Sequence, residues 1–168
     1  TMMERGLDPA PLESQGVFVA RDSDPLPGLA FCFPGQGVHY IGMGQQLYRD
    51  DADVRSVFDR VDAMARASFG FELLEHVFGA PGDAGIEQEL GTLVGAQTAA
   101  FAMEVALGRW LLARGVQPDV FIGHSFGEIC ALTVAGTWDL EVGYQVVTER
   151  IHAAGIPATT GGPALGMM

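Results

Sequence analysis

The feature that most constrains the fold is a serine held between two glycines at the end of a short apolar run. The sequence GHSFG at residues 123–127 follows the apolar run VFI at 120–122 and precedes another apolar run, ICAL, at 129–132. A chain that passes from a buried strand straight into a helix must turn sharply, and the glycines two residues either side of Ser125 leave room for that turn. The pattern predicts a strand, a tight turn and a helix, with the Ser125 hydroxyl exposed at the carboxyl edge of a sheet.

The rest of the chain alternates between short apolar runs and helical patterns. The run LAFCF at residues 29–33 predicts a second buried strand, which ends in the glycine-rich turn PGQG at 34–37. Apolar residues between 54 and 65 recur at helical spacing, with Arg55, Asp59, Arg60 and Asp62 on the opposite face. We expect further helices at 93–113, 128–135 and 140–153, the last capped by Asp139. This order of elements predicts an α/β fold, a short parallel sheet flanked by helices.

Composition excludes several classes of protein. A net charge of −12 disfavours a nucleic-acid-binding surface, and the sequence has no run of basic residues long enough to contact successive phosphates of a nucleic acid. The two cysteines, Cys32 and Cys130, lie among apolar neighbours without metal-ligand spacing, and we expect both to be reduced and buried. The apolar stretch 93–113 is interrupted by Glu104 and Arg109, which predicts a core helix and no membrane span. With no signal peptide pattern at residues 1–20, the expected location is cytoplasmic.

A serine nucleophile needs a base, and the histidines offer no convincing one. His124 adjoins Ser125, and neighbouring residues at a strand end point in opposite directions, so it is a poor base that could line the pocket. His76 and His152 fit helix ends, and His39 fits the rim of the site. We therefore expect the base to lie outside these 168 residues.

At this point the motifs resemble a known family. FPGQG at 33–37, GMG at 42–44, Gln97 and GHSFGE at 123–128 stand in the order seen in malonyl-CoA:acyl-carrier-protein acyltransferases. That family includes the acyltransferase domains of polyketide and fatty acid synthases. The resemblance implies that Ser125 accepts the acyl group and that the backbone N–H groups of Gln36 and Phe126 form the oxyanion hole. It also implies that Arg150 and His124 face the substrate; a planar guanidinium suits the free carboxylate of a malonyl group.

The resemblance sets the expected domain organisation. Residues 1–28 look like the linker that precedes such a domain, and residues 29–168 like the N-terminal part of its hydrolase-like large subdomain. The chain stops about where the ferredoxin-like small subdomain of the family begins, so the catalytic histidine is expected beyond it. Two departures are Ala99-Ala100, where the family commonly has Pro followed by Ala or Leu, and His39, which replaces a common glutamine.

The implied reaction moves a malonyl-type extender unit from CoA to the phosphopantetheine thiol of an acyl carrier protein. No metal or bound cofactor is implied, and the partners would be acyl-CoA, the carrier protein, neighbouring synthase domains and the remainder of the acyltransferase domain. The triplet HSF favours malonyl over methylmalonyl without fixing the extender unit. Two alternatives share the same elbow: a serine hydrolase or thioesterase, and an inactive docking scaffold.

Overall fold

The computed structural model describes residues 28–155, which contain a pair of parallel strands. β1 (Ala30–Phe33) lies beside β2 (Val120–Gly123), with Ala30 opposite Val120 and Phe33 opposite Gly123. Because the two strands run parallel, their carboxyl ends meet at one edge, where the Pro34–Gly37 turn and the serine elbow come together. The helices in this part of the chain are α2 (Gln45–Asp50), α3 (Ala52–Phe69), α4 (Leu73–Val77), α5 (Ala84–Leu90), α6 (Leu93–Ala113), α7 (Gly127–Val134) and α8 (Leu140–Ala153).

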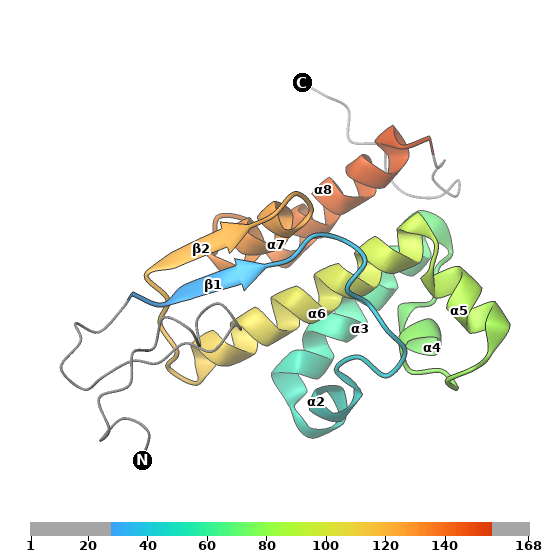
Figure 1. Cartoon of the computed structure of the whole chain (residues 1–168), viewed down its shortest axis with the longest axis horizontal. Coiled ribbons are helices and arrows are strands. Elements are labelled where there is room, and N and C mark those ends of the chain that lie inside the picture. The colour runs from blue at the N-terminus through green and yellow to red at the C-terminus, as the bar shows by residue number, and fades with distance from the viewer. Residues whose placement is uncertain (1–27, 156–168) are drawn as a thin grey trace, which may run out of the picture.

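Helix α6 runs through the middle of the molecule, with α3 on one side and the sheet with α7 and α8 on the other (Figure 1). It is buried around much of its circumference, and the buried positions are mainly small residues. At Gly108 an added Cβ would lie 2.8 Å from a methyl carbon of Val134, so a glycine here lets α7 pack against the backbone of α6. Thr92 is the N-cap of this helix, and its hydroxyl accepts the backbone N–H of Gly95 at 3.0 Å.

The sequence predicted the elements of this core well. Helices α6 and α8 have the expected bounds, α7 begins and ends one residue earlier than expected, and the Asp139 carboxylate accepts the Val142 N–H at 2.8 Å as an N-cap. The short parallel sheet confirms the α/β prediction. The short helices α2, α4 and α5 were not predicted, because each is too short to show a clear apolar period.

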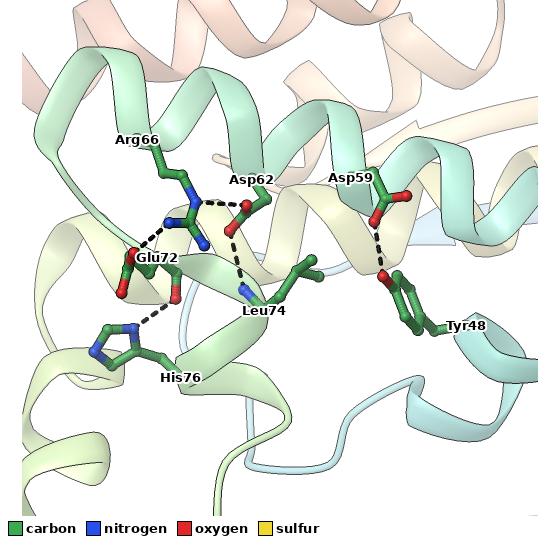
Figure 2. A network of polar contacts seen from close by, with 7 residues as sticks. All are labelled: Tyr48, Asp59, Asp62, Arg66, Glu72, Leu74 and His76. Carbon is green, nitrogen blue, oxygen red and sulfur yellow. Dashed lines mark hydrogen bonds and ion pairs between the residues drawn. The ribbon is translucent and has the colours of Figure 1, made fainter.

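Asp62 corrects the expected polar face of α3. Its side chain is buried, and its carboxylate accepts hydrogen bonds from Arg66 Nε at 2.7 Å and from the Leu74 N–H at 3.1 Å. Figure 2 shows Arg66 reaching from Asp62 to Glu72, while His76 Nδ1 donates to the Glu72 carbonyl at 2.6 Å. The carboxylate is therefore paired on the inside and ties α3 to the start of α4.

The two cysteines differ, which corrects one expectation. Cys130 is buried, and burial raises the pKa of its thiol, but Cys32 is exposed on β1. The reason is that the face of the sheet carrying Cys32, Val120 and Ile122 has no cover within residues 28–155. Among the described residues no single helix is both long and apolar enough to cross a membrane; α5 and α6 meet those criteria only when joined across a 77° bend.

Candidate active site

Ser125 occupies the strained turn that the sequence predicted. It lies between β2 and α7 with φ at 55°, the only positive φ at a non-glycine residue in the described part of the chain. Such a backbone conformation costs free energy for any residue with a side chain and persists only where the surrounding packing enforces it. The Ser125 side chain is exposed, so its hydroxyl is open to a reactant.

The glycines around the serine are required by close backbone contacts. A Cβ on Gly127 would lie 2.2 Å from the Phe33 carbonyl oxygen and 2.4 Å from the Pro34 carbonyl oxygen. A Cβ on Gly123 would lie 2.4 Å from the backbone nitrogen of Glu128. The end of β1 thus packs directly on the first turn of α7, which no side chain larger than hydrogen would allow.

The start of α7 meets the serine turn without a side-chain cap. Phe126 is the N-cap residue and provides no side-chain hydrogen bond to the first turn. Its ring is fully buried, which anchors the peptide that follows Ser125. Since the amino end of a helix carries partial positive charge, this end is suited to an anionic oxygen near Ser125.

The Pro34–Gly37 turn is fixed from α6. Gln97 is 2% exposed, and its Nε2 donates to Gln36 Oε1 at 2.9 Å. His124 also contacts this turn. Its backbone N–H donates to the Phe33 carbonyl at 3.0 Å. Its imidazole lies against Gly35, where an added Cβ would be 3.2 Å from the His124 Nδ1. The structure thus brings Gln36, His124 and Phe126 to the serine turn, and Gln97 is an additional residue that holds the turn.

Arg150 places its guanidinium beside the serine hydroxyl. It lies in the last turn of α8, and its Nη2 donates to Ser125 Oγ at 3.4 Å. Helix α8 is held at that register from within, because the buried Tyr144 hydroxyl is 3.0 Å from Thr98 Oγ1 on α6. A Cβ on Gly143 would lie 2.2 Å from Thr133 Oγ1, so α8 also packs closely on α7. The guanidinium is exposed and can exchange the hydroxyl for a carboxylate.

The histidines lie elsewhere or in unsuitable positions, within the residues that the structure describes. His76 ends α4 and stacks on Phe71, whereas His152 ends α8 with its ring edge-on to Phe69. His39 faces a hollow of about 250 Å³ beside α5, and burial lowers its pKa. No hydrogen bond joins any of these rings to Ser125 in this part of the chain, so a base outside the 168 residues stays a prediction. Across residues 28–155 no group of His, Cys, Asp and Glu side chains is placed to hold a metal ion.

A strained serine at the carboxyl edge of a parallel sheet is typical of the class of α/β folds that carry a serine elbow between a strand and a helix. Comparison with known proteins defines the family within that class. The model of the acyl transferase domain matches residues 30–156, and this chain belongs to the acyl transferase domain family.

The relatives are much longer proteins. A phenolphthiocerol/phthiocerol polyketide synthase of Mycobacterium tuberculosis is 32% identical over 150 residues, which cover 89% of this chain and 9% of that protein. The solved acyltransferase domain from the second module of the salinomycin polyketide synthase is 39% identical with a TM-score of 0.61, covering 73% of this chain and 28% of its own. A malonyl-transacylase solved with its type II polyketide synthase acyl-carrier protein is 30% identical, with a TM-score of 0.63. The match covers 74% of this chain and 38% of the transacylase. The chain thus spans a small part of each relative.

Proposed function

We propose that this chain is the nucleophile-bearing part of an acyltransferase that moves a malonyl-type unit from CoA to the phosphopantetheine thiol of an acyl carrier protein. One observation carries the proposal: the guanidinium of Arg150 lies 3.4 Å from the hydroxyl of the strained Ser125. A serine that only hydrolyses esters needs no cation beside its hydroxyl. A serine that accepts a malonyl group does, because that group ends in a free carboxylate.

In the first half-reaction Ser125 Oγ attacks the thioester carbonyl carbon of malonyl-CoA. The negative charge on the carbonyl oxygen is stabilised by two backbone N–H groups, that of Gln36 in the Pro34–Gly37 turn and that of Phe126 at the amino end of α7. The C–S bond then breaks, CoA leaves as the thiol, and the malonyl group stays on Ser125 as an oxygen ester. The proton from the hydroxyl passes to the departing sulfur through a base that we expect to be a histidine in the rest of the domain.

The second half-reaction reverses these steps with a different thiol. The phosphopantetheine thiol of the carrier protein attacks the acyl-serine carbonyl, and Ser125 regains its proton. Arg150 holds the malonyl carboxylate throughout, and His124 lines the pocket beside it. Transfer of this kind needs no metal and no bound cofactor. The malonyl-transacylase solved with its acyl-carrier protein supports the choice of acceptor.

The experiment is covalent loading of the complete protein with radiolabelled malonyl-CoA. Wild type should retain label on Ser125 until a carrier protein is added, whereas Ser125→Ala should retain none. Ser56→Ala, an exposed serine on α3, is the matched control and should load normally. Rapid release of label as free malonate in wild type would indicate a hydrolase instead, and label retained by Ser125→Ala would exclude this serine as the acceptor.

A further inference from the structure

A small pocket between α3 and α6 lies away from the serine. Figure 1 shows the two helices side by side, and the pocket lies between the first half of α3 and the last turns of α6. Its volume is about 270 Å³, and its lining includes Arg60, Arg109 and Trp110. Arg109 follows Gln97 on α6 by about 18 Å along the helix axis, at about 1.5 Å per residue, so the α3–α6 pocket is separate from the Pro34–Gly37 turn that Gln97 holds.

Arg109 has no counter-ion in this pocket. Its side chain is half-buried, and no carboxylate within residues 28–155 forms an ion pair or a hydrogen bond with it. Burial lowers the pKa of Arg109 and the positive charge of Arg60 lowers it further, while the carboxylates of Glu141 and Asp139 act in the opposite direction without pairing with it. Arginine is rarely buried in folded proteins unless it is paired. The guanidinium of Arg109 is therefore a set of donors, partly removed from water, that lacks an acceptor.

Arg60 brings a second guanidinium to the same pocket. Its Nε donates to Glu141 Oε1 at 3.0 Å, and its Nη2 donates to the same oxygen. In the part of the chain that the structure describes, Arg60 Nη1 makes no hydrogen bond, so this side chain keeps donors to spare. Glu141 neutralises one of the two guanidiniums and leaves the other uncompensated. Asp53 also lines the pocket, but it lies in the exposed first turn of α3, where solvent and salt screen its charge.

The pocket wall is held in place before any ligand binds. Trp110 Nε1 donates to Asp51 Oδ2 at 3.1 Å, and the guanidinium of Arg114 lies 3.8 Å from the centre of the Trp110 ring. Arg114 also pairs with Asp51 at 2.6 Å, so the last turns of α6 are tied to the start of α3. Ligand sites are usually largely preformed, and their volumes begin at about 300 Å³, so a pocket of this size suits a small molecule.

Two guanidiniums in one small pocket favour a phosphate group over a carboxylate. A phosphate ester carries about 1.5 to 2 negative charges at neutral pH and has three strong acceptor oxygens, so one group accepts from both arginines. A carboxylate has two oxygens, and a single arginine fork satisfies both. We propose that the α3–α6 pocket binds the phosphate group of a small phosphorylated molecule through Arg109 and Arg60, at a site separate from acyl transfer.

Protection from phenylglyoxal tests the site in the complete protein. The reagent modifies accessible guanidiniums, and site-resolved mass spectrometry gives the rate at Arg109 with inorganic phosphate or with sodium chloride at the same ionic strength. Phosphate at about ten times its measured Kd should slow modification of Arg109 about tenfold, because only the unoccupied site reacts. Arg49, exposed in the last turn of α2, is the control and should react at the same rate in both salts.

Three results of this experiment would overturn the proposal. Equal slowing of Arg109 and Arg49 by phosphate would show ionic screening alone. Slowing of Arg109 by chloride as much as by phosphate would show that the pocket does not select a phosphate. An Arg109 that fails to react in chloride would show that another part of the complete protein covers the pocket.

Calorimetric titration with inorganic phosphate tests the two arginines. Arg109→Met keeps the length of the side chain and removes the donors, so the binding heat should be lost, and Arg60→Met should weaken binding. Arg49→Met is the matched control and should bind phosphate as wild type does. Binding by Arg109→Met with the wild-type Kd would place the phosphate elsewhere, and acetate bound as tightly as phosphate would contradict the choice of ligand. Neither measurement uses acyl transfer, so this inference and the proposed function can fail separately.

Discussion

Replacing Arg150 by alanine should separate the loading of charged and uncharged acyl groups. Its Nη2 is 3.4 Å from Ser125 Oγ, so a malonyl group on that oxygen brings its carboxylate within reach of the guanidinium. Removing one partner of a hydrogen-bonded charge pair costs about 2–5 kcal/mol when the pair is buried. Arg150 is exposed at the end of α8, where solvent screening weakens the pair, so we expect a loss of about 2–3 kcal/mol.

At about 1.4 kcal/mol per tenfold change, that loss lowers the malonyl loading rate roughly 30- to 150-fold. Acetyl-CoA carries no free carboxylate, so its loading rate should stay within about twofold of wild type. The assay is single-turnover loading of the complete protein with each thioester, expressed as the ratio of the two rates.

Two variants control this experiment. Arg150→Lys should recover part of the malonyl rate, because an ammonium offers one charge without the planar fork of donors. Glu149→Ala changes the neighbouring exposed residue of α8 and should leave the ratio unchanged. If Arg150→Ala slows both thioesters by the same factor, the residue supports the fold of α8 and does not read the substrate.

Three further predictions follow from the packing around the site. Gly127→Ala places a Cβ 2.2 Å from the Phe33 carbonyl oxygen and should lower the melting temperature strongly. Gly85→Ala on the exposed helix α5 is the control and should not lower it; similar melting curves for the two variants would contradict the close contact at Gly127. Gln97→Leu removes the donor to Gln36 and should slow acyl loading about tenfold. The melting temperature should stay nearly unchanged, because the variant also removes the buried Gln97 Oε1, which has no hydrogen-bond partner among the described residues. Unchanged loading would show that this hydrogen bond does not position the Pro34–Gly37 turn. Burial raises the pKa of Glu104 to about 7, so the folded state favours the protonated carboxyl, and the free energy of unfolding should fall as the pH rises from about 4.5 through about 7. Urea titrations at several pH values measure this slope, and Glu104→Gln should flatten it. The same slope in both proteins would exclude Glu104 as its cause.

Local sequence chemistry was enough to predict the serine elbow. The glycines at 123 and 127 can be recognised without a structure, because a sharp turn between an apolar strand and a helix excludes side chains at those positions whatever the rest of the fold does. Asp139 at the start of α8 is a similar case, since an N-cap depends on the few residues that follow it.

Pairings between distant segments could not be predicted in this way. Gln97 reaches Gln36 across 61 positions, and Arg150 reaches Ser125 across 25, and neither separation follows from helical or strand periodicity. The arginine was assigned to the site through the family resemblance, and the distance to the serine depends on how α8 packs on α6 and α7.

The burial of individual side chains was the property least well predicted from the sequence. Asp62 has the composition of a surface residue but is buried, because Arg66 and the Leu74 N–H satisfy its carboxylate. Cys32 has the neighbours of a core residue but is exposed, because nothing within residues 28–155 covers that side of β1. Whether a side chain is buried depends on which other elements reach it and on the partners they bring, and only the tertiary structure decides that.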